Sequence, residues 1–274
     1  MEMGGFSITF LKLDDELKPY YDAPCYSPYY AKGSVSGETV EDDGEDEEIE
    51  FDENDVEPAE IVRSKEGELT ELNAEDTRNM LLYIADKIIA NKPYLTEIDS
   101  VIGDGDHGIG MAGGMQKAKK KLLKMQGEEN AYQLFETAGQ AMLMSMGGAS
   151  GVIFGSLYLA GAKGMDPQAV ITAKDLADME KKSLAAIQER GGAEVGDKTM
   201  VDALSPAVDA LAANADKGLL EMLKAAEEGA KQGVENTKKY VAKFGRAKSL
   251  LERAIGHQDA GATSVYLIFQ GMRE

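Results

Sequence analysis

Apolar residues recur at intervals of three and four through most of the chain after residue 76, which is the spacing of an amphipathic α-helix. The first such segment covers residues 80–89, with Asp76 and Thr77 available as helix caps and Pro93 as a stop. Similar patterns run through residues 108–125, 129–145, 150–164, 173–190, 199–213, 217–234, 235–244 and 262–272. The pattern therefore predicts an all-α domain of amphipathic helices over residues 76–274.

The chain before this helical region follows different patterns. Residues 6–13 begin with alternating apolar and polar positions, the period of a half-buried strand, and we treat residues 1–36 as a short tail containing it. Between Glu41 and Glu60 there are 13 Asp or Glu residues and no Lys or Arg. Such a segment buries too little apolar surface to offset its ordering entropy, so we predict an acidic flexible linker over residues 37–75. A contact segment for a basic partner is the alternative.

Composition narrows the class of protein. A net charge of −20 argues against nucleic acid, whose phosphates the chain would repel. The single cysteine, Cys25, excludes an internal disulfide framework and favours a reducing compartment. No apolar run approaches the roughly 18 residues that a membrane-spanning helix needs, and the first residues lack the order of a signal peptide. We therefore expect a cytoplasmic protein with no membrane contact.

One glycine-rich turn, residues 95–108, concentrates acidic side chains beside one of the two histidines. It contains Asp99, Asp104 and Asp106, followed by His107. Carboxylate oxygens are ligands that Mg²⁺ prefers, and Mg²⁺ usually lies between carboxylates and the phosphates of a nucleotide. A solvated Asp-Gly turn is the simpler alternative. The clustering favours a metal and phosphate site here.

Three known nucleotide or cation motifs do not fit this turn. Residues 103–108 have the glycine spacing of the dinucleotide fingerprint, but two aspartates there would repel a pyrophosphate unless a cation intervened. Counting from Asp104, Met115 occupies the twelfth position, where a calcium-binding EF-hand loop needs a glutamate. A Walker loop is also missing, because no Gly-Lys-Ser/Thr occurs. A cation-assisted phosphate site remains the preferred hypothesis.

Further polar strings occur at the borders of the predicted helices. Gly-Gly-Ala-Ser-Gly at 147–151 would present free backbone amides at a helix start, although a simple N-cap with a tight turn is the more frequent explanation of such a string. Gly-Asp-Lys-Thr-Met at 196–200 could likewise be a turn and cap. Arg246 could pair with phosphate or cap a helix, and it precedes Gly-His-Gln-Asp-Ala-Gly-Ala-Thr-Ser at 256–264. For His257 within that string, a purely structural role is the alternative to a role in the site.

Taken in order, these strings resemble the nucleotide-binding L subunit, or L domain, of the dihydroxyacetone kinases over residues 76–274. The resemblance rests on Leu-Thr-Glu-Ile-Asp, Gly-Asp-Gly-Asp-His-Gly, Gly-Gly-Ala-Ser-Gly, Gly-Asp-Lys-Thr-Met, and Gly-Arg-Ala followed by Gly-His-Gln-Asp-Ala-Gly-Ala-Thr-Ser. It implies a barrel of eight antiparallel helices that holds a nucleotide at one end. Periodicity alone indicates only the all-α class.

The resemblance also implies roles for individual residues. Asp99, Asp104 and Asp106 would be catalytic and would hold two Mg²⁺ ions that bridge the phosphates of ATP or ADP. The phosphates would be lined by His107, Gly108, Ile109, Gly110, Ala149 and Ser150, and the rest of the nucleotide by Gly191, Met200, Arg246, Asp259, Ala260 and Gly261. The chain departs from the family pattern at two of these positions, since Gly110 replaces a common Asn and Ala260 a common Pro.

Residues 1–30 resemble the extreme C-terminus of the substrate-binding K domain of the same kinases. The histidine with which that domain binds its ketone has no counterpart, because His107 and His257 both belong to L motifs. The resemblance therefore implies that a separate K subunit holds the ketose. The identity of the ketose would depend on that subunit.

The leading functional hypothesis is a phosphoryl-donor subunit that transfers the γ-phosphate of Mg-ATP to a ketose hydroxyl. One alternative keeps ADP as a bound cofactor, which a phosphotransferase-system protein rephosphorylates from phosphoenolpyruvate. A second is a non-catalytic, ADP-bearing protein that binds a regulator. A third is a kinase for a carrier-presented substrate, as in fatty acid kinases, against which the Asp-His-Gly string counts. A homodimer is a further candidate assembly.

Overall fold

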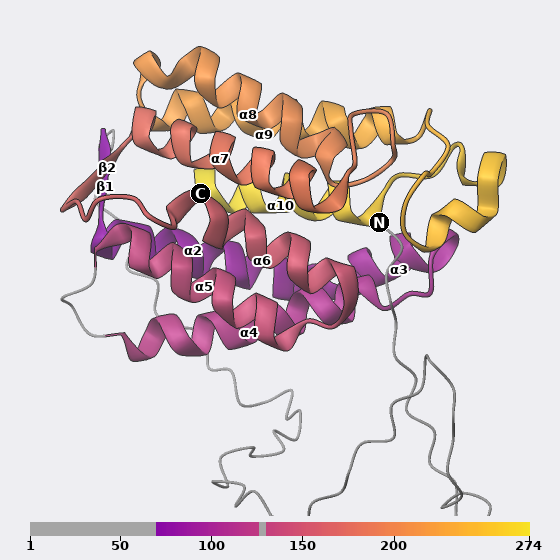
Figure 1. Cartoon of the computed structure of the whole chain (residues 1–274), viewed down its shortest axis with the longest axis horizontal. Helices are drawn as coiled ribbons and strands as arrows, with labels where there is room; N and C mark the ends of the chain where they lie inside the picture. Colours follow the sequence, from indigo (N-terminus) through magenta and orange to yellow (C-terminus); the bar gives the residue numbers. More distant parts are fainter. Residues whose placement is uncertain (1–69, 126–129) are drawn as a thin grey trace, which may run out of the picture. The chain divides into compact units, whose positions relative to one another are not determined.

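Nine α-helices account for most of residues 70–125 and 130–274, which are the parts of the chain that the computed structural model describes (Figure 1). The helices are α2 (Ala74–Ala90), α3 (Lys92–Ile102), α4 (His107–Lys124), α5 (Ala131–Ser145), α6 (Gly148–Ala162), α7 (Ala173–Gly191), α8 (Val201–Asn214), α9 (Leu219–Thr237) and α10 (Ala260–Arg273). Two 3₁₀ segments, η1 (Ala215–Lys217) and η2 (Arg246–Ala254), and two strands, β1 (Glu71–Asn73) and β2 (Val170–Thr172), complete them. The predicted tail and nearly all of the predicted linker lie outside the described residues.

Eight of these helices form a closed ring. Each of α2, α4, α5, α6, α7, α8, α9 and α10 packs against the next one in this order, and α10 packs against α2. The apolar stripes of the helices face one shared core, in which Leu81, Phe135, Leu204 and Phe269 are buried. The short α3 lies outside the ring and packs against α4 and α10. The predicted all-α barrel of amphipathic helices is confirmed.

The ring has two different ends because successive helices alternate in direction. Helices α4, α6, α8 and α10 begin at one end, close to α3, and we call this the α4 end (Figure 1). Helices α2, α5, α7 and α9 begin at the opposite end. There β1 and β2 pair antiparallel, with buried Leu72 opposite buried Ile171. The two strands therefore cover the end of the core that is remote from α3.

The segment around the first two helices differs from the sequence prediction. Pro93 does not end a helix but lies in the first turn of α3, where the missing N–H costs nothing. Residues 95–108 are accordingly not one turn, because α3 continues to Ile102 and only residues 103–106 are irregular. The linker predicted over residues 37–75 also extends too far along the chain, because the folded part begins before residue 75. Strand β1 and the capping box of α2, in which Asn73 accepts the N–H of Asp76, already belong to the folded part.

The helix predicted over residues 235–244 is wrong. Helix α9 ends at Thr237, and the following residues leave the helical path. The Thr237 carbonyl accepts a hydrogen bond from the Lys198 ammonium at 2.6 Å, and the Lys243 N–H binds the Asp197 carbonyl at 3.1 Å. Hydrogen bonds to a distant loop thus replace those that would continue the helix.

None of the helices among the described residues is both long enough and apolar enough to cross a bilayer.

Glu180 of α7 is an acidic side chain in the core and is only 1% exposed. Within the described structure, its Oε2 atom has no hydrogen-bond partner, and neither does the hydroxyl of buried Tyr158. Burial raises the pKa of Glu180 from 4.5 to about 8. The folded protein therefore binds more protons than the unfolded chain between these two pH values.

This buried carboxyl predicts how stability depends on pH. The contribution of this carboxyl to the free energy of unfolding should be complete below about pH 4.5 and should be lost, by a few kcal/mol, as the pH rises to about 8, since the folded state favours the neutral carboxyl. Glu180→Gln should remove this contribution, so that stability falls less steeply over this range, and it should stabilise the protein at pH 8. Urea unfolding at several pH values measures both. Glu189→Gln, at an exposed position of the same helix, is the control and should follow the wild-type curve. Parallel curves for wild type and Glu180→Gln would refute the prediction.

Candidate active site

Three carboxylates meet where α3 joins α4. Asp99 lies in the last turn of α3, and Asp104 and Asp106 lie in the connecting turn. One oxygen atom from each carboxylate lies within 4.8 Å of the other two. Burial raises the pKa of Asp106, and the neighbouring charges of Asp104 and Asp99 raise it further. A divalent cation would relieve this repulsion, so the donor set fits Mg²⁺.

Glycines allow this crowding. A Cβ atom at Gly103 would lie 2.2 Å from Oδ1 of Asp99, so any other residue would displace this carboxylate. Gly105 has φ +76° and also approaches the Ser100 hydroxyl, so both its conformation and its surroundings require glycine. The close approach keeps Asp99 against the turn that carries the other two carboxylates.

Backbone amides at the starts of α4 and α6 are left without side-chain caps. Asp106 precedes α4 and Gly147 precedes α6, and neither residue makes a side-chain capping hydrogen bond. At the opposite end, by contrast, α2, α5 and α7 all begin with a capping box. Apart from the His107 N–H, which donates to Asp99, the first-turn amides of α4 and α6 therefore remain available at positive helix ends. This arrangement is typical of sites that bind anions such as phosphate.

His107 connects three helices at the same end. Its backbone N–H donates to Oδ2 of Asp99 at 3.2 Å, and its Nε2 atom lies 2.8 Å from the Ser264 hydroxyl of α10. Its ring lies 5.7 Å from the ring of Phe154 in α6. Burial lowers the pKa of His107, and the charge of Asp99 opposes this. His107 thus holds the starts of α4 and α10 and the first half of α6 together around the carboxylates.

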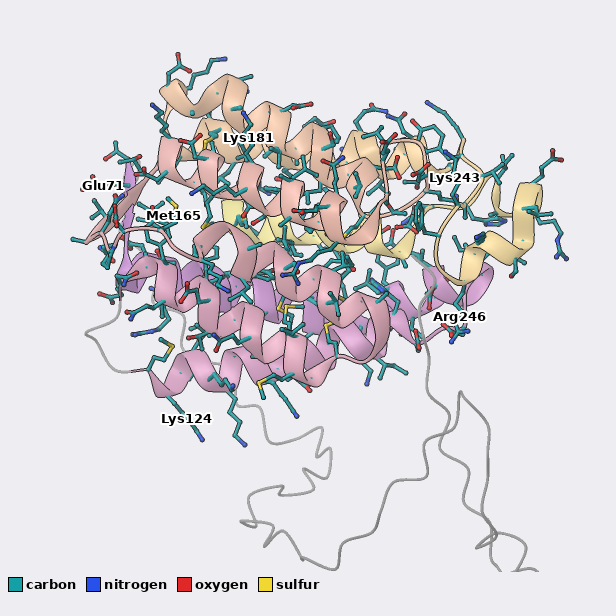
Figure 2. All side chains as sticks on the ribbon, in the orientation of Figure 1. Glu71, Lys124, Met165, Lys181, Lys243 and Arg246 are labelled. Carbon is teal, nitrogen blue, oxygen red and sulfur yellow. The ribbon has the colours of Figure 1, made fainter. Side chains whose placement is uncertain are left out.

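Arg246 supplies positive charge beside the carboxylates. Its Nε atom lies 2.8 Å from Oδ2 of Asp104, while 79% of the side chain is exposed. A shallow pocket of about 300 Å³ lies here, lined by Val101, Ile102, Gly103, Asp104, Arg246, Ser249 and Leu250. Figure 2 shows Arg246 and Lys243 at the α4 end and Glu71 at the other. An exposed guanidinium can move from a carboxylate to an incoming phosphate with little rearrangement.

The start of α10 forms another wall of this region. Asp259 caps α10 by accepting the Ala262 N–H at 2.7 Å, and burial raises the pKa of Asp259 to about 7. A Cβ atom at Gly261 would lie 3.4 Å from Cβ of Met200, the residue preceding α8. The starts of α8 and α10 therefore touch.

The residues that the sequence singled out all lie in or next to helix termini at the α4 end. Gly191 belongs here because it ends α7, and a Cβ atom on it would lie 3.4 Å from Ile153 in the first half of α6. The full set comprises Asp99, Asp104, Asp106, His107, Gly108, Ile109, Gly110, Ala149, Ser150, Gly191, Met200, Arg246, Asp259, Ala260 and Gly261. The structure adds Lys198, Thr237 and Ser264, whose side chains bond across this end. Sequence reasoning gave these three no individual role, because their types are common in any turn.

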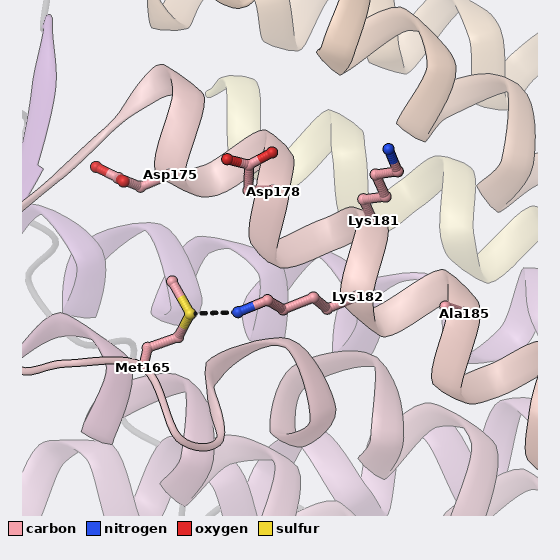
Figure 3. A pocket seen from close by; sticks show the side chains of 6 residues that line it. All are labelled: Met165, Asp175, Asp178, Lys181, Lys182 and Ala185. Carbon is pink, nitrogen blue, oxygen red and sulfur yellow. Dashed lines mark hydrogen bonds between the residues drawn. The ribbon is translucent and has the colours of Figure 1, made fainter.

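A larger pocket lies elsewhere, on the outer side of α7. Its volume is about 410 Å³, and it is lined by Met165, Asp175, Asp178, Lys181, Lys182 and Ala185 (Figure 3). The Lys182 ammonium points at the Met165 sulfur, 2.7 Å away. Its acidic and basic side chains are interspersed, and the carboxylate cluster and helix starts described above contribute nothing to its lining. We therefore place the candidate active site at the smaller pocket.

Comparison with known proteins gives a consistent result. The DAK2 domain model matches residues 101–274. The ADP-binding subunit DhaL of the PEP-dependent dihydroxyacetone kinase of Escherichia coli (strain K12) is 37% identical over 194 residues, which are 70% of this chain and 92% of that protein. The L-erythrulose kinase of Pectobacterium atrosepticum is 33% identical over 274 residues, and the match covers 98% of this chain. This chain spans only 45% of that longer kinase.

A solved structure shows the same fold. The dihydroxyacetone kinase from C. freundii, crystallised in complex with AMP-PNP and Mg²⁺, matches with a TM-score of 0.57 and 25% identity. The match covers 77% of this chain and 36% of that one. The chain described here therefore belongs to the DAK2 domain family and carries a DhaL-type nucleotide-binding domain.

Proposed function

We propose that the chain is the nucleotide-binding, phosphoryl-donor component of a short-ketose kinase. The observation that carries the proposal is the placement of the Asp99, Asp104 and Asp106 carboxylates beside the uncapped starts of α4 and α6. Phosphoryl transfer asks a protein mainly for positioning and charge neutralisation, and this end of the barrel offers both.

Each group of residues at the α4 end would contact a different part of the bound Mg-nucleotide. Asp99, Asp104 and Asp106 would hold two magnesium ions, which when bound neutralise phosphate charge. Residues His107 to Gly110, Ala149 and Ser150 would line the phosphates, and the free amides among them, those of Gly108, Ile109, Ala149 and Ser150, would donate to phosphate oxygens. Arg246 would add a mobile cation. Gly191, Met200 and the Asp259–Gly261 turn would enclose the rest of the nucleotide.

The acceptor ketose would be held by a second, K-type subunit. The DhaL relative is the ADP-binding subunit of its kinase, which is consistent with a division of nucleotide and ketose between chains. The exposed α4 end leaves the carboxylates and Arg246 accessible to such a partner. Docking there would bring a ketose hydroxyl to the nucleotide phosphate.

The sequence favoured exchangeable ATP as the phosphoryl donor, but the relatives favour bound ADP. The DhaL match covers 92% of a subunit named for ADP binding and PEP dependence. We therefore propose that ADP stays bound, receives a phosphoryl group from a phosphotransfer protein linked to phosphoenolpyruvate, and passes it to the ketose. The ADP is unchanged over the cycle, so only the phosphoryl group and one hydroxyl proton are transferred.

Exchangeable ATP is the second candidate because of one specific observation. The erythrulose kinase match covers 98% of this chain, whereas the DhaL match covers 70%, so the longer kinase also matches a part of the chain that DhaL does not. In this mode the ketose oxygen would bond to the γ-phosphorus, ADP would leave, and the hydroxyl proton would be released.

One experiment separates these functions. The purified chain is desalted and mixed with Mg²⁺, a K-type subunit and either dihydroxyacetone or L-erythrulose, and then supplied with ATP or with phosphoenolpyruvate and phosphotransfer proteins. We expect phosphorylated ketose with phosphoenolpyruvate, and co-purified ADP. Product with ATP alone would establish the second candidate. Retained ADP without product from either donor would instead support a regulatory binder.

A further inference from the structure

A buried lysine lies behind the candidate site, in the loop between α7 and α8. Lys198 is 2% exposed, which is rare for a charged side chain. Its backbone adopts φ +60°, a left-handed conformation that seldom occurs outside glycine, Asn and Asp. The Lys198 side chain points into the protein. The surroundings show what it holds.

The Lys198 ammonium joins two other segments of the chain. It donates to the carbonyl of Thr237, the last residue of α9, at 2.6 Å, and also to the carbonyl of His257 in the turn before α10. The carboxylates of Asp259 and Asp202 supply compensating negative charge and oppose the lowering of the Lys198 pKa by burial. A single side chain thus connects the α7–α8 loop, the end of α9 and the approach to α10.

The loop that carries Lys198 is itself fixed. Asp202 accepts the N–H of Gly196 at 2.6 Å and that of Thr199 at 2.7 Å. Asp197 accepts the N–H of Glu194 at 2.8 Å and pairs with the Lys243 ammonium at 2.5 Å. Hydrogen bonds on both sides of Lys198 therefore keep its backbone in place. Because the loop fixes the Lys198 ammonium, the ammonium can in turn fix the carbonyls of Thr237 and His257.

Those partners adjoin the proposed nucleotide wall. The Thr237 hydroxyl accepts the N–H of Asp259 at 3.0 Å, and Asp259 caps α10. Gly261, two residues later, approaches Met200, which lies two residues after Lys198. The distance between the starts of α8 and α10 thus depends on the bonds that Lys198 makes.

We propose that Lys198 is a positioning residue that sets the start of α10 against Met200 and so preforms the nucleotide site; the inference rests on the proposed function. It acts through Thr237, His257 and Asp259 and does not touch the nucleotide. Without the ammonium, the Thr237 and His257 carbonyls lose the donor that joins them, and the turn before α10 can move away. Misplacing a binding wall weakens binding even when the chemistry is intact.

The chain offers a matched control for the loss of a buried lysine. Lys119 of α4 is 3% exposed and pairs with Asp86 of α2 at 2.5 Å. It lies about three turns of helix from the start of α4, far from the carboxylates. Lys198→Met and Lys119→Met therefore remove similar groups, one beside the site and one remote from it.

The test is the dissociation constant of Mg-ADP for the full chain, measured by calorimetry beside the melting temperature. Lys119→Met should lower the melting temperature and leave ADP affinity unchanged. Lys198→Met should weaken ADP binding about tenfold, while turnover at saturating nucleotide falls less than about threefold. Affinity and turnover would change together if the lysine served only overall stability.

Two further outcomes keep the inference separable from the proposed function. Wild-type protein that binds no ADP would refute the proposed function itself. If wild type binds and folded Lys198→Met binds within twofold of it, the positioning role alone is refuted. If Lys198→Met does not fold, Thr237→Val, which removes only the hydroxyl that receives the Asp259 N–H, decides instead. It should weaken ADP binding about threefold, and unchanged affinity would overturn the inference.

Discussion

Replacing Asp104 by asparagine should reduce phosphoryl transfer by at least about 10³-fold, equivalent to about 4 kcal/mol of transition-state stabilisation. The variant removes one charge from the carboxylate cluster and breaks the ion pair with Arg246. Its fold should persist because Asp104 is exposed and such surface pairs contribute little to stability. Product formation with the K-type subunit and the donor that wild type uses measures the loss.

Metal binding shows whether this loss has the proposed cause. Mn²⁺ titrated into the protein in the presence of ADP should bind more weakly to Asp104→Asn, as followed by electron paramagnetic resonance. Asp209→Asn is the matched control, an exposed aspartate on α8 away from its start. It should retain full activity and metal affinity. Activity within tenfold of wild type in Asp104→Asn would contradict the assignment of the carboxylates.

Replacing Gly108 by alanine should lower the free energy of unfolding by more than about 3 kcal/mol and reduce transfer about 100-fold. Gly108 is buried in the first turn of α4, and a Cβ atom there would lie 2.3 Å from the Thr96 hydroxyl and 2.4 Å from the Lys92 carbonyl. Backbone cannot yield cheaply, so α4 must move away from α3. Urea unfolding measures the first effect, and ketose phosphorylation with the K-type subunit measures the second.

Gly147→Ala provides the control for this glycine. Gly147 precedes α6 with φ −75°, and a Cβ atom on it would meet nothing within 4 Å. Its free energy of unfolding should change by less than about 0.5 kcal/mol. Equal stability of the two variants would show that the contact between α3 and α4 is looser than the structure indicates.

The helical class was readable from the sequence because long helices repeat their apolar stripe several times. Predicted residues 173–190 became α7 (Ala173–Gly191), and 262–272 lie within α10. Short elements gave no such signal. Strands β1 and β2 have three residues each, and α3 buries only Leu95 and Ile102. The strands are too short, and the buried positions of α3 too few, to show a period in the sequence.

Part of the candidate site was likewise visible in the sequence, and part was not. Asp99, Asp104 and Asp106 stand within eight residues, so their clustering was visible before any fold was known. Their closeness to the starts of α6 and α10 was not, because periodicity does not say which helix ends meet. The family resemblance implied that meeting, and the geometry displays it through the contacts of His107 with Phe154 and Ser264.

By itself, the sequence determined the all-α class, the local grouping of the three carboxylates and the strings that border the helices, since each depends on residues close together in the chain. Tertiary structure alone decided where α9 ends, which helix starts remain uncapped, and that Lys198 reaches Thr237 and His257. The end of α9 and the contacts of Lys198 depend on hydrogen bonds between residues tens of positions apart. Such bonds exist only after the ring of helices has closed.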